Sequence, residues 1–152
     1  MKPTSELKDS INTSTLTLAL LTMATMGIYP LMWLYRQVPT LSKITGKPLV
    51  NDSYVIWIGV CVGIGGIFSG SGDEDLEAFA GLLIIAANVL YIVFGFKAKR
   101  VLEDYARETY GIELKMNPFY TFGFNLYYVN YTINKLATLQ PALTPTTTVI
   151  PN

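Results

Sequence analysis

The chain has 152 residues, of which 51% are hydrophobic and only 14% are charged, and its 11 basic and 11 acidic residues balance. About a quarter of the residues of an ordinary soluble domain are charged, and a domain of this size has too little interior to hide so much apolar surface from water. The balanced charge argues against a nucleic-acid-binding protein, which needs a clustered basic face. Composition therefore predicts a protein that places apolar surface against lipid.

The first predicted element is a membrane helix over residues 16–35, after a polar N-terminal segment, 1–13. The run LTLALLTMATMGIYPLMWLY is uncharged, and 20 helical residues cover the roughly 30 Å hydrocarbon core. A secretory signal peptide is the alternative, but its apolar region is about 7–15 residues long and ends at small residues. Pro30 is expected to kink this helix. The aromatic and basic end of the run predicts interface anchors at Trp33, Tyr35 and Arg36.

Three further spans are predicted from predominantly apolar runs at residues 54–70, 78–96 and 118–136. Asn117 followed by proline is a typical helix start. The last run is short and aromatic, so a helix lying in the membrane interface is its alternative. After the third run, the pattern KAKRVLEDYARETYG carries opposite charges four residues apart, which predicts that the helix continues into water as far as Gly111.

The predicted fold is therefore an all-α membrane protein with four transmembrane helices within residues 14–137. The third helix has a cytoplasmic extension. The tail, 138–152, is rich in proline and threonine and is expected to be extended or disordered.

The distribution of basic residues predicts the orientation in the membrane. The links 37–53 and 97–117, counted with Arg36, hold eight of the 11 lysines and arginines, whereas the acidic link 71–77 holds none. The positive-inside rule then places the first and third links in the cytoplasm and both termini outside, although two lysines in the N-terminal segment count against this. The acids at residues 73–77 lack the spacing of a calcium-binding EF-hand loop and predict a solvated link.

The second span carries glycines at steps of four, three and four residues, which places them on one helical face. These glycines are Gly59, Gly63, Gly66 and Gly70. In lipid, such a face lets another helix approach closely, so we predict a helix-packing groove, either within one chain or between two copies.

Polar side chains lie within the first, third and fourth predicted spans. They are Thr22, Thr25, Tyr29, Asn88, Tyr127, Asn130 and Asn134. Amides in lipid need hydrogen-bond partners, so this polar seam predicts hydrogen bonds that hold the helices together. A path for a small polar solute or a binding site for a lipid headgroup is the alternative interpretation.

The sequence offers little for catalysis. It contains no histidine, the commonest general base and metal ligand, and its single cysteine, Cys61, makes neither an intrachain disulfide nor a zinc site. We find no combination of nucleophile, base and orienting group. A non-enzymatic protein without a metal, a cofactor or catalytic residues is predicted.

Two aromatic motifs resemble a known family. The first is a Thr-x-Gly-Ile-Tyr-x-x-x-Trp-x-Tyr pattern, and the second is a Tyr-x-x-Tyr-x-x-Asn pattern. The matching residues are Thr25, Gly27, Ile28, Tyr29, Trp33 and Tyr35, then Tyr128, Tyr131 and Asn134. Over residues 14–137 the chain resembles the small bacterial multi-pass membrane proteins catalogued as domain of unknown function 4234. The resemblance implies a bacterial cytoplasmic membrane and supplies no activity.

Together these features predict an accessory, scaffold or assembly subunit of a bacterial membrane complex. Its expected partners are the lipid bilayer and either another protein or a second copy of the chain, with no nucleic acid. A small oligomeric transporter or channel for a polar solute is the alternative.

Overall fold

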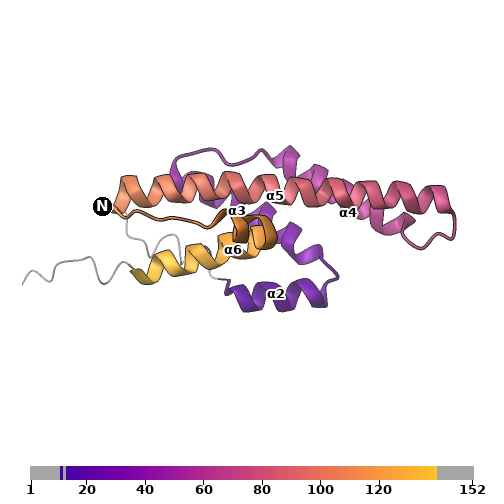
Figure 1. Cartoon of the computed structure of the whole chain (residues 1–152), viewed down its shortest axis with the longest axis horizontal. Coiled ribbons are helices and arrows are strands. Elements are labelled where there is room, and N and C mark those ends of the chain that lie inside the picture. The colour runs from indigo at the N-terminus through magenta and orange to yellow at the C-terminus, as the bar shows by residue number, and fades with distance from the viewer. Residues whose placement is uncertain (1–10, 12, 140–152) are drawn as a thin grey trace, which may run out of the picture.

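The computed structural model describes residue 11 and residues 13–139, and this part of the chain contains five α-helices and no strand (Figure 1). The helices are α2 (Thr15–Ala24), α3 (Ile28–Thr45), α4 (Asp52–Phe68), α5 (Glu74–Tyr110) and α6 (Pro118–Leu139). The all-α prediction is confirmed for these residues. Most of the predicted N-terminal segment 1–13 and of the tail 138–152 lies outside the described residues.

The first predicted span is two helices rather than one. α2 ends where Met26 and Gly27 take positive φ values of 50° and 90°. The Thr25 hydroxyl donates to a carbonyl in the last turn of α2 at 2.7 Å and accepts the N–H of Tyr29, in α3, at 2.9 Å. α2 is folded back and lies below α6 (Figure 1). The prediction of one continuous helix over residues 16–35 is wrong, because this threonine satisfies backbone groups on both sides of the break.

The predicted kink at Pro30 is also wrong. Pro30 is the third residue of α3, in the first turn, where a backbone N–H has no partner within the helix and proline is tolerated. Pro39 is the proline inside α3, where it removes one backbone hydrogen bond. The helix then ends at Gly46, whose φ of 69° is the left-handed conformation that suits a glycine C-cap.

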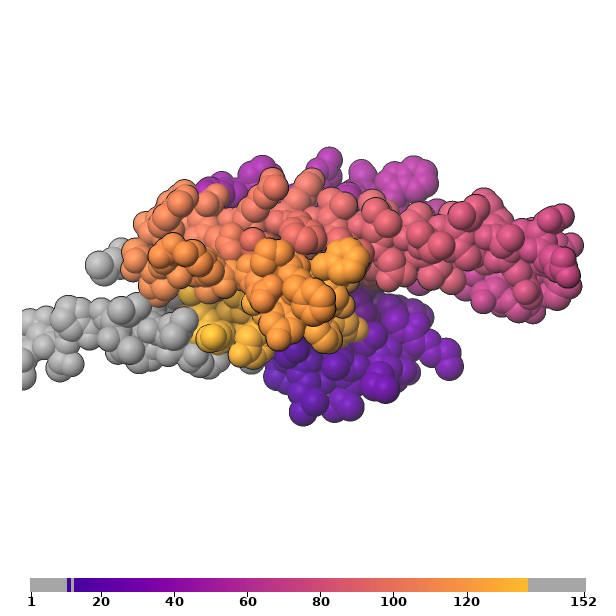
Figure 2. Space-filling model, in the orientation of Figure 1, coloured from indigo at the N-terminus to yellow at the C-terminus, as the bar shows by residue number. Residues whose placement is uncertain are grey.

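α4 and α5 form an antiparallel pair whose far end projects beyond the other helices (Figures 1 and 2). The link between them turns at Gly70 and Gly72, which both have positive φ. The Asp73 side chain then caps α5 by accepting the N–H groups of Asp75 at 3.0 Å and Leu76 at 3.1 Å. Acidic residues are favourable at a helix N-terminus, so most of the predicted acidic link is the first turn of α5.

The projecting pair exposes large apolar side chains on its outer faces. They are Ile56, Trp57, Val60, Ile64 and Ile67 on α4, and Phe79, Leu82, Ile84, Ile85, Val89 and Val93 on α5. Soluble monomers rarely expose contiguous apolar patches larger than a few hundred Å². By length and apolar composition α5 could cross a membrane, and it is the one helix among the described residues that meets both conditions.

The opposite half of the molecule, which we call the polar half, consists of residues 34–45 of α3, residues 97–110 of α5, and α6. Its buried side chains include Leu34, Leu41, Leu102, Tyr105, Ile133 and Leu136. Lys47, just after α3, pairs with Asp104 at 3.1 Å and Glu108 at 2.9 Å on α5. These two carboxylates raise the pKa of Lys47, because each accepts a hydrogen bond from its ammonium group, with the larger effect from Glu108. The helical extension predicted after the third span is therefore present, as residues 97–110 of α5, and its buried side chains belong to the hydrophobic core.

α6 lies beside the charged end of α5. Its start is as predicted: the Asn117 side chain accepts the Phe119 N–H at 2.9 Å. The helical backbone is interrupted at Asn125, where α6 passes Gly95 of α5 so closely that a Cβ on this glycine would lie 3.1 Å from the Asn125 Cβ. α6 packs against α5 and α2. Whether α6 crosses the membrane or lies in its interface stays a prediction.

Candidate functional site

The predicted polar seam is not brought together as one surface. Thr22 donates to a carbonyl of its own helix at 2.7 Å, as Thr25 does. Asn88 is exposed, and its amide donates to the Ile84 carbonyl of the same helix at 2.9 Å. Tyr29 and Tyr127 are half-buried against the hydrophobic core. Thr22, Thr25 and Asn88 therefore make hydrogen bonds within their own helices, and the two tyrosines pack against the hydrophobic core. These residues do not line one continuous path.

The two amides of α6 do join separate elements. The side-chain N–H groups of Asn130 and Asn134 both donate to the Thr13 carbonyl, at 2.9 Å and 3.1 Å. Asn130 also donates to the Thr15 hydroxyl at 3.3 Å. Asn130 is fully buried, and its Oδ1 has no hydrogen-bond partner among the described residues. The cluster fixes the start of α2 to the polar half, as expected for amides that hold helices together.

Replacing these amides tests their structural role. We expect Asn130→Leu to lower the free energy of unfolding by about 0.6–2 kcal/mol, the range of interhelical hydrogen bonds in membrane proteins. Asn134→Leu should cost less, because Asn134 is only partly buried. The double variant should lose more than the sum, because the Thr13 carbonyl then loses both donors. Unfolding in mild detergent measures all three, and an Asn130→Leu variant as stable as the parent would rule the role out.

The predicted glycine groove is not a continuous helix contact. Gly59 faces the Leu31 side chain, whose Cδ2 would lie 3.1 Å from an added Cβ. Gly63 and Gly66 have no packing neighbour among the described residues within 4 Å of such a Cβ, and Gly70 lies in the link after α4. The close contact with α5 is made instead by Gly65, which was not predicted. The prediction erred because periodicity identifies a row of glycines but not the face on which a partner helix packs.

The three predicted interface anchors separate in the structure. Trp33 is only 2% exposed and lies in the core with Leu34, so its assignment as an anchor is wrong. Tyr35 is 61% exposed, and Arg36 is exposed as well. Helical geometry turns adjacent residues to different faces, so only part of an aromatic cluster can lie on the outside.

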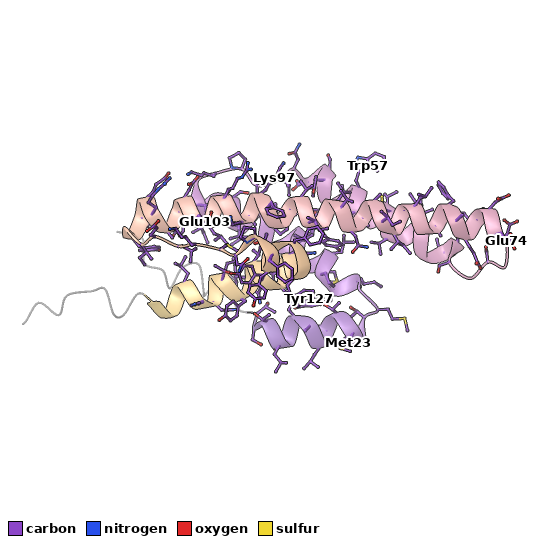
Figure 3. The ribbon with its side chains drawn as sticks, in the orientation of Figure 1. Met23, Trp57, Glu74, Lys97, Glu103 and Tyr127 are labelled. Carbon is purple, nitrogen blue, oxygen red and sulfur yellow. The ribbon has the colours of Figure 1, made fainter. Side chains whose placement is uncertain are left out.

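A cleft of about 680 Å³ lies on the polar half, between α5 and the segment that leads back to α6. Its lining residues are Lys99, Glu103, Asp104, Arg107, Glu113, Leu114, Lys115, Met116, Asn117 and Pro118. Figure 3 shows Glu103 on α5 beside this returning segment. Six of the ten residues are charged, three of each sign, so the cleft is a polar surface with alternating charge.

Glu103 connects the two walls of the cleft. Its carboxylate accepts the Met116 backbone N–H at 2.8 Å and pairs with Lys99 at 3.5 Å. The Lys99–Glu103 pair is one of the helical charge pairs that the sequence predicts, whereas Arg107 pairs with Asp104 at 3.1 Å. The hydrogen bond to Met116 ties α5 to the segment that forms the other wall of the cleft.

The rim of the cleft carries an exposed ion pair. Lys115 and Glu113 pair at 3.0 Å, with side chains 82% and 78% exposed. The returning segment begins at Gly111, whose φ of 65° lets the chain reverse after α5. The sequence predicts the helical extension that forms one wall of this cleft but not the cleft itself, because the chain reversal sets which residues face α5.

No protein-family model, no curated protein and no solved structure matches this chain. The resemblance to domain of unknown function 4234 therefore stays a prediction.

Proposed function

We propose that this chain is a non-enzymatic accessory or scaffold subunit of a bacterial membrane complex, inserted in the cytoplasmic membrane by the α4–α5 pair. The cleft on the polar half would bind a polar segment of a partner protein. The cleft is the observation that carries the proposal, because this charged surface is built on the same helix, α5, that is long and apolar enough to cross a membrane.

The exposure of the α4–α5 pair supports the membrane location. Leu82 and Ile85 on α5 are 66% and 62% exposed, and Trp57 on α4 is 63% exposed (Figure 3). Burying such side chains in lipid gains roughly 25 cal/mol for each Å² removed from water. Water is a poor environment for this half of the molecule, whereas lipid suits it.

Two crossings account for the charge distribution better than four. α2 has 10 residues, about 15 Å of helix, which is half of the roughly 30 Å needed to cross. The Asn130 and Asn134 bonds fix the start of α2 beside the polar half. We infer that α2 and the start of α3 enter one leaflet and return, so that both termini lie in the cytoplasm and not outside as the four-span prediction has them.

The positive-inside rule favours this arrangement. All 11 lysines and arginines, including Lys2 and Lys8, then lie on the cytoplasmic side or at its interface, and the outer link between α4 and α5 has none. Basic residues near span ends set orientation in short loops. The N-terminal lysines, which count against four spans, agree with two.

A transporter or channel would need the polar seam to line one path. Asn88 is exposed on the projecting pair and bonds its own helix, whereas Asn130 is buried against the start of α2. This separation favours the scaffold over the transporter.

Photo-crosslinking in living cells tests the proposed function. A photoreactive residue at Glu113, on the rim of the cleft, should crosslink to one protein of defined mass, which mass spectrometry identifies. The same residue at Thr109, exposed on α5 but outside the cleft, should not. Crosslinks between two copies would make the partner a homo-oligomer. Equal products at the two positions, or solute flux through liposomes that hold this protein alone, would contradict the proposal.

A further inference from the structure

A groove of about 320 Å³ lies between α3 and α4, on the flank of the apolar pair. Its lining residues are Leu31, Met32, Tyr35, Arg36, Val55, Ile56 and Gly59. The volume falls within the range of small-molecule sites, about 300–1,000 Å³. Arg36 is the one charged residue among the lining residues, so the groove is apolar except for a single cationic side chain.

The floor of the groove is set by Gly59. A Cβ at this position would lie 3.1 Å from Leu31 Cδ2, so the two helices touch where α4 has no side chain. Ile56, one turn earlier on α4, is 58% exposed, and Met32 on α3 is 55% exposed. These two side chains, one from each helix, line the groove and are open to the surroundings of the molecule.

The groove has a direction. α3 starts beside Gly59 and runs toward the polar half, where Lys47 bonds α5. Tyr35 and Arg36 lie one turn farther along α3 than Leu31 and Met32, so they are at the edge of the polar half. The apolar end therefore points into the membrane and the cationic end toward its surface, which is the order of acyl chain and phosphate in a phospholipid.

Arg36 is available for a ligand. Its side chain is exposed, and it forms no ion pair with any carboxylate of residue 11 or residues 13–139. A guanidinium group presents paired N–H donors that match the oxygens of a phosphate. The adjacent Tyr35 hydroxyl suits the same wet boundary, where tyrosine prefers to lie.

We propose that this groove binds one phospholipid with a net negative headgroup. An acyl chain lies along Leu31, Ile56 and Gly59, and the phosphate meets Arg36. The lining offers no carboxylate for the ammonium group of a zwitterionic headgroup, so anionic lipid is preferred. The inference rests on the proposed membrane insertion.

Native mass spectrometry of the full-length chain tests this site. The detergent-solubilised protein is given phosphatidylglycerol or phosphatidylcholine with identical acyl chains. We expect one phosphatidylglycerol to be retained for each chain. Arg36→Gln should lower that retention about tenfold or more, because a charge-assisted hydrogen bond contributes roughly 1.5–3 kcal/mol. Arg100→Gln, an exposed arginine on α5 outside the groove, is the matched control and should retain lipid as the parent does.

Membrane retention in cells separates this site from the proposed function. If the parent and the Arg36→Gln variant both stay in the membrane fraction and only the variant loses phosphatidylglycerol, the groove is supported. Equal retention of the two lipids, or equal retention by the parent and the Arg36→Gln variant, overturns the lipid site and leaves the membrane anchor standing. A parent chain found in the soluble fraction overturns both.

Discussion

Replacing Ile85 by arginine is expected to abolish stable insertion of the α4–α5 pair. Ile85 is 62% exposed and lies near the middle of the apolar stretch 78–96 of α5. An arginine at the centre of a membrane helix costs about 2.5–3.5 kcal/mol on insertion scales. In water the same surface substitution would change stability by only about ±0.5 kcal/mol. The effect therefore distinguishes a lipid-facing helix from a solvent-facing one.

The measurement is the fraction of protein that resists alkaline extraction from membranes. Thr109→Arg supplies the control, since Thr109 is exposed on the same helix but in the polar half. We expect the control to be retained like the parent and the Ile85→Arg variant to be degraded or extracted. A well-folded Ile85→Arg protein with unchanged membrane retention would mean that this face of α5 does not contact lipid.

Gly65→Leu is expected to separate α4 from α5. A Cβ at Gly65 would lie 3.0 Å from Ile84 Cγ1 and 3.3 Å from the Ala80 carbonyl oxygen. The isoleucine side chain can rotate, but the carbonyl belongs to the backbone of α5, so the two helices have to move apart. Overpacking of this kind costs about 1–3 kcal/mol, and three further leucine carbons add to it.

Gly63→Leu is the matched control on the same helix. No packing neighbour among the described residues lies within 4 Å of a Cβ at Gly63, so leucine there has open space around it and gains helix propensity. Melting temperatures in mild detergent should fall for Gly65→Leu and stay level or rise for Gly63→Leu. A lower melting temperature for Gly63→Leu than for Gly65→Leu would instead support the row of glycines that the sequence predicts as the packing surface.

The sequence predicts those elements whose signals are local. The start of α6 follows from Asn117 and proline, and the stop of α5 follows from Gly111, because caps and left-handed glycines act within a few residues. The apolar stretch of α5 and its charged continuation are likewise visible as a change of composition along one helix.

The break between α2 and α3 was missed because hydropathy averages over it. Thr25, Gly27 and Pro30 together are a helix-start signature: a side-chain acceptor, a glycine at the cap and a proline in the first turn. Because these three residues lie within an uncharged run, they are interpreted as part of one kinked membrane helix. An uncharged run of this length passes the hydropathy test for a membrane span whether or not the chain turns back within it. The residues typical of a turn therefore indicate the break better than hydropathy does.

The candidate sites depend on contacts that no local pattern contains. The packed glycine is Gly65 and not Gly63, because the position of α5 decides which face of α4 is covered. The second wall of the polar cleft comes from Glu113 and Lys115, which face α5 only after the chain reverses. Arg36 joins a groove because Gly59 lets α3 approach α4.

Cysteine accessibility in intact cells tests the two-crossing arrangement most directly. In a Cys61→Ala background, Ser5→Cys, Ser71→Cys and Thr109→Cys place single thiols before α2, between α4 and α5, and at the end of α5. A thiol reagent that cannot cross membranes should label only the Ser71→Cys variant, and all three after the cells are permeabilised. Labelling of the Ser5→Cys variant in intact cells, with Thr109→Cys protected, would show that residues 16–35 cross the membrane and would contradict a protein anchored by the α4–α5 pair alone.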